Sequence, residues 1–140
     1  MRAWSLLALR ITVALLVLHW GLDKILDPGH ALRVSDNFYG GLLSHPSLIP
    51  ILGILQVSVA LLALAGALRQ IVDPLILLIN LGTMMGVWRS VVDPWGWFLE
   101  GTNALFFPSV IVVAGCLVLI AFRDQEGFAV DRWWAGRSSG

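Results

Sequence analysis

The sequence predicts an all-α polytopic membrane protein, a bundle of four transmembrane helices with short interfacial helices in the outer loops. Of its 140 residues, 58% are hydrophobic and only 13% are charged, whereas soluble domains average about 25% charged residues. A soluble core of this size cannot hide so much apolar surface. None of the apolar runs alternates polar and apolar residues as the strands of a membrane barrel do. We therefore expect one helical membrane domain in contact with the lipid bilayer.

Four segments qualify as membrane spans, since a helix needs about 20 mostly apolar residues to cross the bilayer core. They run over about 4–22, 47–68, 74–91 and 104–122, and a tail follows at 123–140. The first run carries Arg10 and lacks a clear small-x-small cleavage site. It is therefore expected to be a retained helix and not a cleaved signal peptide.

Three Asp-Pro pairs predict helix starts, because Asp caps a helix and Pro suits its first position. They stand at residues 27–28, 73–74 and 93–94. The first predicts a surface helix to about Phe38, and the second predicts the start of the third span. The third predicts an interfacial helix to about Thr102, whose aromatic side chains suit the headgroup zone.

The basic residues outside the spans predict the orientation. With both termini inside, five of them face the cytoplasm and three face outward; the inner group is Arg2, Arg69, Arg123, Arg132 and Arg137, and the outer group is Lys24, Arg33 and Arg89. This bias predicts a multi-pass protein with both termini in the cytoplasm. The net charge is zero and no run of Lys or Arg occurs, so nothing indicates a nucleic-acid partner.

Small residues predict where helices pack closely, because close backbone approach drives helix association in lipid. Gly82 and Gly86 form a GxxxG pair in the third span, and the second span carries a small face of Ala60, Ala63, Gly66 and Ala67. These faces are expected to pack together within the bundle. A dimer interface, and so a homo-oligomer, is the alternative.

Arg10 is the most informative polar residue in the spans, since a cation deep in the bilayer costs about 2.5–3.5 kcal/mol on insertion scales. It can snorkel to the inner face or pair there with Asp73 or Asp124. Asn80 lies at a similar depth and can accept a hydrogen bond from the guanidinium. Arg10 is thus either a structural anchor or a functional charge in a pocket. Gln56, near the middle of the second span, is expected to bridge helices.

A helical stripe defines the inward face of the first span. At 100° per residue, Arg10, Gly21 and Lys24 share one stripe, and His19 lies on the opposite side. His19 is therefore expected at the outer interface, with a haem or metal ligand as the alternative. The remaining histidines lack ligand-like spacing, and Cys116 is the only cysteine. No metal site is predicted.

A candidate ligand or ion-pair site is expected at the outer mouth of the bundle, where Lys24, Arg89 and Glu100 can converge. Their charges would sum to one net positive, which suits an anionic group or a quinone carbonyl. The neighbouring aromatic side chains are Trp95, Trp97 and Phe98. A purely structural ion pair explains the same residues, and no catalytic residue is assigned.

The first span and the following turn resemble the DoxX family of small four-helix bacterial membrane proteins. Arg10, Gly21 and Lys24 match the arginine, glycine and lysine with which that family opens. Gly66 and Glu100 resemble a glycine and a glutamate found further along. The sequence departs from the family at Val13, where a glycine is common, and at Gln56, where an acidic residue is common.

The resemblance implies a bacterial inner-membrane component linked to redox metabolism, because the family is named with membrane subunits that pass electrons to the quinone pool. The first hypothesis is an accessory or quinone-facing subunit of an oxidoreductase complex, with other redox subunits as partners and a quinone as the one cofactor implied. The second is a non-catalytic scaffold for partner proteins. The third is a small transporter. The spans contain few polar residues to line a path for a solute, which argues against this hypothesis. The chain alone is not expected to catalyse a reaction, because no nucleophile, acid pair or phosphate loop is found.

Overall fold

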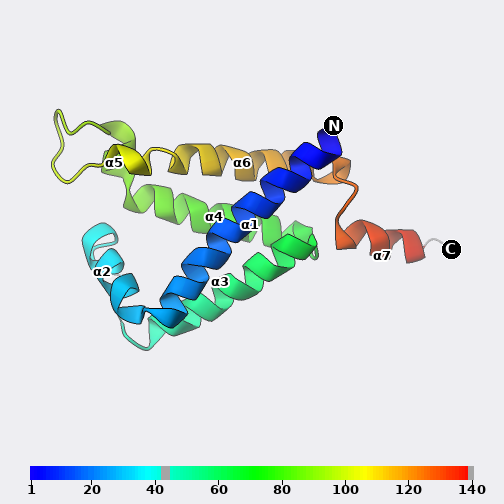
Figure 1. The fold of residues 1–140 in the computed structure, drawn as a ribbon, viewed down its shortest axis with the longest axis horizontal. Coiled ribbons are helices and arrows are strands. Elements are labelled where there is room, and N and C mark those ends of the chain that lie inside the picture. The colour runs from blue at the N-terminus through cyan, green and yellow to red at the C-terminus, as the bar shows by residue number, and fades with distance from the viewer. Residues whose placement is uncertain (42–44, 139–140) are drawn as a thin grey trace.

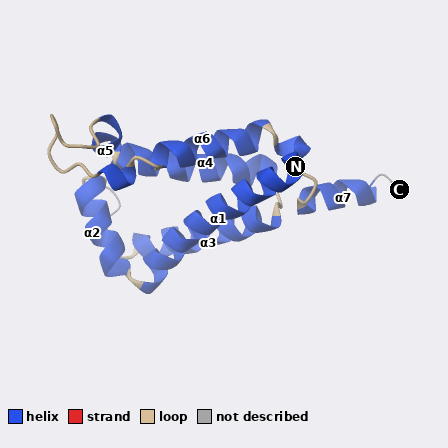
Figure 2. Ribbon diagram, turned by 45° about the horizontal axis from the view of Figure 1, so that its top comes forward, coloured by secondary structure: helices blue, strands red, loops and turns tan. Residues whose placement is uncertain are grey.

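The computed structural model describes residues 1–41 and 45–138, and every regular element in these two ranges is a helix. Figures 1 and 2 show the arrangement. The elements are, in chain order, α1 Arg2–Leu26, α2 Pro28–Phe38, α3 Leu48–Ala65, α4 Arg69–Gly86, α5 Trp88–Val92, η1 Ala104–Phe106, α6 Ser109–Ala121, η2 Arg123–Gln125 and α7 Val130–Ser138. The tail residues 139–140 lie outside the described part.

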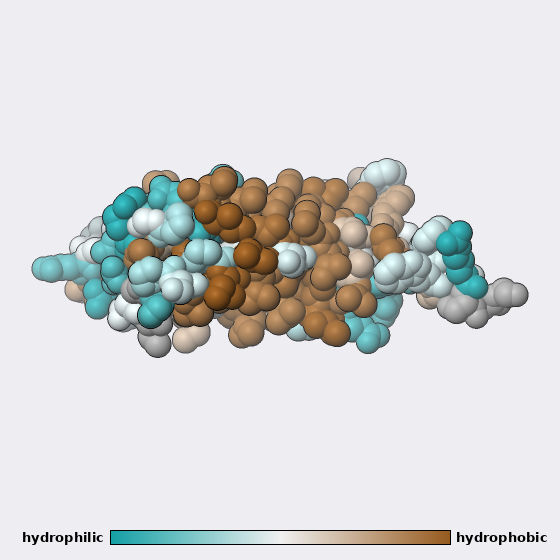
Figure 3. All heavy atoms as spheres, turned by 90° about the horizontal axis from the view of Figure 1, so that it is seen from below, coloured by the Kyte–Doolittle hydropathy of each residue, from teal (hydrophilic) through white to brown (hydrophobic). Residues whose placement is uncertain are grey.

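Three helical segments are long and apolar enough to cross a membrane. They are Arg2–Leu26, Leu48–Ala65 and Ala104–Ala121. The face seen in the space-filling view has a broad apolar band across its middle and polar surface at its two ends (Figure 3). Such a band flanked by polar ends is what contact with a bilayer requires.

The long helices form two pairs. α1 packs along α3, and α4 packs along α6. The pairs come together at the end that holds both chain termini and separate toward the opposite end (Figures 1 and 2). At that opposite end α2 connects the pairs, because it continues from α1 and its Phe38 ring packs edge-on against Phe106 of η1, with centroids 5.4 Å apart. The core between the pairs consists of small and medium side chains: Val13, Ala14, Val17, Ala60, Ala63, Val72, Ile76, Cys116 and Leu119.

The closest helix contact uses two glycines at the α1–α3 crossing. A Cβ added at Gly21 would lie 2.9 Å from the backbone nitrogen of Val57, and one at Gly53 would lie 2.9 Å from the Gly21 carbonyl oxygen. Gly21 is therefore a packing glycine, as its inward stripe predicts. Gly53 supplies the matching surface of α3 and was not singled out in the sequence.

The expected packing of Gly82 and Gly86 against another span is wrong. Gly82 is exposed, and nothing lies within 4 Å of where its Cβ would be. A Cβ on Gly86 would lie 2.7 Å from the ring of Tyr39, which follows α2. This glycine thus accommodates an aromatic ring from a connecting segment and not a neighbouring span.

Of the three Asp-Pro pairs, only the first opens the predicted helix. Asp27 caps α2 by accepting the His30 N–H at 2.9 Å. Pro74 instead lies inside α4, which begins five residues earlier at Arg69. Residues 94–103 after the third pair are irregular, and the short helix α5 precedes them. The span expected over about 74–91 is not one continuous helix, because α4 ends at Gly86 and the chain turns at Val87 before α5 begins.

Gly66 ends α3 and has a left-handed backbone with φ of 70°. There is no room for a side chain here, because a Cβ would lie 2.8 Å from the Cα of Ala129 and 2.9 Å from Nη1 of Arg10. The turn after Gly66 leads directly into α4, so the end of α3 and the start of α4 lie beside Arg10.

Candidate functional site

A buried ion cluster lies at the end of the bundle that holds the termini, and Arg10 forms one half of it. Its Nε donates to both Glu126 carboxylate oxygens at 2.9 and 3.1 Å, and its Nη2 lies 2.9 Å from Oε1. Its Nη1 donates to the carbonyl oxygens of Ala63 and Leu64, both at 2.6 Å. These carbonyls belong to the last turn of α3, where the helix dipole favours a cation.

Arg69 forms the other half. Its Nε and Nη2 each lie 3.1 Å from Oδ2 of Asp73, one turn along α4, and its Nη1 lies 3.1 Å from Oε2 of Glu126. The guanidinium also donates to two carbonyls near the end of α6, those of Leu119 at 3.3 Å and Arg123 at 3.2 Å. Glu126 therefore bridges two arginines through its two oxygens.

Together the two guanidiniums join all four long helices at this end. Arg10 comes from α1 and binds the end of α3, whereas Arg69 comes from α4 and binds the end of α6. Asp131 adds a second link, since its carboxylate accepts the backbone N–H groups of Leu68 at 2.7 Å and Arg69 at 2.8 Å. It thus caps α4, a role that sequence analysis assigned to Asp73.

The cluster is fully desolvated and electrically balanced. The exposed fractions are 2% for Arg10, 2% for Arg69, 5% for Asp73 and 0% for Glu126. Two positive and two negative side chains lie together, so no net charge is buried. An unpaired buried charge is strongly destabilising, whereas a paired and hydrogen-bonded one is tolerated.

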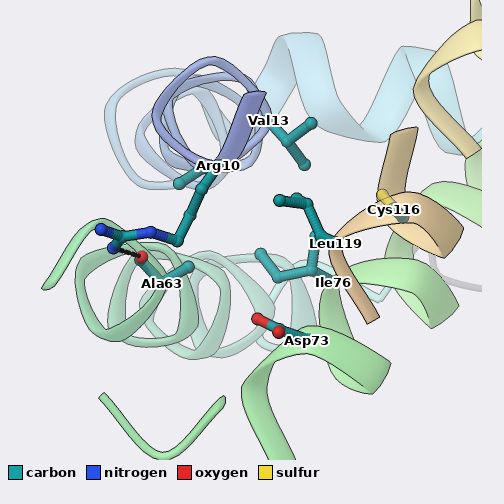
Figure 4. A pocket seen from close by; sticks show the side chains of 8 residues that line it. Arg10, Val13, Ala63, Asp73, Ile76, Cys116 and Leu119 are labelled. Carbon is teal, nitrogen blue, oxygen red and sulfur yellow. Dashed lines mark hydrogen bonds between the residues drawn. The ribbon is translucent and has the colours of Figure 1, made fainter. Parts of the chain in front are cut away.

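A small cavity adjoins the cluster on its apolar side (Figure 4). It is lined by Arg10, Val13, Ala14, Ala63, Asp73, Ile76, Cys116 and Leu119. Its volume of about 10 Å³ is room for roughly one water molecule. The guanidinium of Arg10 points out of this space toward the carbonyl of Ala63, as Figure 4 shows.

Glu126 replaces the partners that sequence analysis proposed for Arg10. Neither Asp73 nor Asp124 pairs with Arg10 among the described residues; Asp73 belongs to Arg69. Asn80 is buried, and its amide donates to the Ile76 carbonyl of its own helix at 2.8 Å instead of accepting from Arg10. The residues after Glu126, Gly127-Phe128-Ala129-Val130, are neutral and apolar, but Asp73 and Asp93 have similar flanks, so this pattern alone does not single out Glu126.

The expected convergence at the outer mouth is not found as an ion pair. Within residues 1–41 and 45–138, no ion pair joins any two of Lys24, Arg89 and Glu100. The Lys24 ammonium donates weakly to the Trp20 carbonyl at 3.4 Å, and the Arg89 guanidinium lies 5.9 Å from the Trp88 ring centroid. None of these contacts joins one of the three residues to another.

An ordered turn forms after α5 instead. The carboxylate of Asp93 accepts the backbone N–H groups of Trp97 at 3.0 Å, Phe98 at 2.6 Å and Leu99 at 2.9 Å. These hydrogen bonds stabilise the carboxylate and lower the pKa of Asp93, and the bond from the Phe98 N–H has the largest effect. Desolvation acts in the opposite direction and only partly offsets them. This turn leaves the side chains of Trp95, Trp97 and Phe98 largely exposed.

The two other polar candidates lie apart from the cluster. Gln56 is half-buried beside Gly21, and its Oε1 is buried with no hydrogen-bond partner within the described ranges. It contacts α1 without the bridging hydrogen bond that was expected. His19 is exposed on the outward side of α1, and no group of three potential metal ligands occurs in the described residues.

Comparison of the chain with protein-family models, curated proteins and solved structures gives no significant match in any of the three.

Proposed function

We propose that the chain is an accessory membrane subunit of a redox complex, which anchors the complex in the bilayer and carries no redox centre of its own. The observation that supports this proposal most is the saturated ion cluster. Every charge of Arg10, Arg69, Asp73 and Glu126 is matched by another, and the cavity beside them has room for about one water molecule. This suits a rigid support better than a site that turns over a substrate.

We propose that four helices span the membrane, with α4 as the fourth. Hydropathy alone does not select α4, because Arg69 and Asp73 lie near its start. These two charges are paired and buried, and the residues from Pro74 to Gly86 are apolar apart from Asn80 and Thr83. α4 also packs along α6 (Figure 2).

The proposed orientation places both termini in the cytoplasm of a bacterial inner membrane. Both termini lie at the same end of the molecule, as an even number of spans requires (Figure 1). Five basic residues outside the apolar runs belong to that end and three to the other, and such a bias favours the cytoplasm for the richer end.

The redox assignment is supported by the resemblance of Arg10, Gly21 and Lys24 to the DoxX pattern. A quinone head group is far larger than the cavity beside Cys116, so we place any quinone contact at the lipid-facing surface or at the outer mouth. A non-catalytic scaffold for other proteins is the second candidate, which the same rigid cluster favours equally.

Purification of a tagged chain from its native host in mild detergent would test the proposal, with mass spectrometry of both bound proteins and bound quinones. We expect redox subunits in a fixed ratio to the chain and absent from an equally tagged, unrelated four-span protein. Recovery of other partners in a fixed ratio, with neither redox subunits nor quinone, would favour the scaffold and refute the redox assignment.

A further inference from the structure

The segment 122–131 connects α6 to α7 and crosses the end of the bundle; we name it the C-terminal strap. Two of its inward contacts are made by carboxylates, since Glu126 bridges Arg10 and Arg69, and Asp131 caps α4. We propose that Arg10 and Arg69 form a binding site for one anionic group, a phosphate or a carboxylate, which Glu126 occupies in the observed state as an internal ligand.

The chemistry of the site fits a single anion. Guanidinium groups present parallel N–H donors that match the oxygens of a carboxylate or phosphate. With Glu126 withdrawn, Arg10, Arg69 and Asp73 carry one net positive charge. One singly charged oxyanion would restore neutrality and accept the hydrogen bonds that Glu126 now accepts from the two arginines.

The strap is thin where it covers the site. Glu126 is fully buried, yet its neighbours Asp124, Gln125, Gly127 and Phe128 are all exposed. The segment that carries Glu126 therefore runs along the surface and directs this one carboxylate inward. The strap lies where α3 ends and α4 begins, at the edge of the apolar band (Figures 1 and 3), and phospholipid phosphates occupy that level of a bilayer.

Several contacts hold the strap in place besides Glu126, and three of them lie near its C-terminal end. Asp131 caps α4, the Phe128 ring packs on Trp4 with centroids 4.5 Å apart, and Ala129 lies against Gly66. A tethered ligand has an effective concentration in the millimolar range for short linkers. A competing anion must therefore be present at high local concentration, as lipid headgroups are in an anionic leaflet, or as inorganic phosphate is at tens of millimolar.

Removing the internal ligand should create an anion-dependent stability. We would compare Glu126→Ala with wild type and with Asp124→Asn, which removes a neighbouring exposed charge without touching either arginine. Thermal unfolding would be followed in neutral detergent at constant ionic strength. The additions would be inorganic phosphate against chloride, and phosphatidylglycerol against phosphatidylcholine.

We expect an added anion to raise the Tm of Glu126→Ala by several degrees, in a saturable way. The same anion should not raise the Tm of wild type or of Asp124→Asn. A second substitution, Arg10→Gln, should abolish the increase in Glu126→Ala. A response to phosphate alone would assign a soluble anion, and one to phosphatidylglycerol alone would assign a lipid headgroup. Glu126→Gln, which keeps a hydrogen-bond acceptor, serves if the alanine variant does not fold. A folded variant with no response beyond that of Asp124→Asn overturns the proposal.

Amide hydrogen exchange tests whether an anion displaces Glu126, and so loosens the strap, in the wild-type chain. The competing anion should increase exchange in residues 123–131 of wild type while exchange in α1 and α3 stays unchanged. Unchanged exchange in the strap at saturating phosphatidylglycerol and at saturating phosphate would show that Glu126 does not give way, and would also overturn the proposal.

Discussion

Glu126 lies 116 positions beyond Arg10 in the chain, yet its Oε1 is 2.9 Å from both Nε and Nη2 of that arginine. The pair connects the first helix to the segment that follows the last long one. Because both groups are buried, neither can be lost without leaving one unbalanced charge in the cluster away from water. The cluster therefore makes folding of the N-terminal helix depend on the C-terminal segment.

A double-mutant cycle would measure this coupling. Arg10→Leu and Glu126→Leu alone should each lower the free energy of unfolding by about 3–5 kcal/mol, since each leaves an uncompensated buried charge. The double variant leaves the neutral Arg69–Asp73 pair and should be much less destabilised than the sum. Denaturant unfolding in mixed micelles would report all three values. Simple additivity would show that the two side chains do not act as a pair.

The glycine contact between α1 and α3 gives a second prediction. Gly21→Ala places a methyl group where only 2.9 Å is available to the Val57 backbone, and such overpacking typically costs about 1–3 kcal/mol. Gly82→Ala is the matched control, because open space surrounds that position and Ala is the better helix former by about 1 kcal/mol. Thermal unfolding in detergent should therefore show a lower Tm for the first variant and an equal or higher Tm for the second.

Equal losses of stability in both glycine variants would contradict this packing. A normal Tm for Gly82→Ala together with loss of self-association would instead place Gly82 at a contact between copies of the chain.

Apolar runs and turn residues predicted the helical class and the short helix at 28–38, because these features depend on local sequence. The same Asp-Pro signal was wrong at residues 73–74 and 93–94, where tertiary contacts decide. Asp73 is drawn to Arg69 of its own helix, while Asp131, from a distant segment, caps α4. At Asp93 the carboxylate binds three successive N–H groups in a turn and no helix forms.

The ion cluster was predicted only in part for a similar reason. The depth of Arg10 in an apolar run showed that it needs a partner, but its partner depends on how the chain returns to the first helix. Arg69 reads as a loop charge in the sequence, although it is almost fully buried. Periodicity within one helix cannot report a contact between segments more than 50 residues apart.

The turn held by Asp93 should depend on pH. Its backbone hydrogen bonds lower the pKa of this carboxyl below the ordinary 3.8, so the stabilisation is complete above that value and is lost as pH falls through the lowered pKa. Tryptophan fluorescence of wild type should change across that acidic range. Asp93→Asn removes the charge, so its spectrum should already differ at neutral pH and should lack this transition.

Glu100→Gln is the control for the pH experiment, since Glu100 is exposed in the same loop. Its fluorescence should follow the wild-type profile. A transition that persists in Asp93→Asn would assign the pH dependence to another carboxyl group.

The proposed orientation can be read from cysteine accessibility. Asn37 is exposed on α2, and Gln125 is exposed in η2 at the end that holds the termini. Single cysteines at these positions, in a Cys116→Ala background, place one probe at each end of the molecule. Cys116 itself is only 1% exposed, so its replacement removes a background thiol with little change of surface.

A membrane-impermeant thiol reagent on intact cells should label Asn37→Cys and should reach Gln125→Cys only after permeabilisation. This is the expected pattern because the bias of five basic residues against three favours the cytoplasm for that end. The reverse pattern would place the termini outside, and labelling of both sites in intact cells would contradict a molecule whose two ends lie on opposite sides of the membrane.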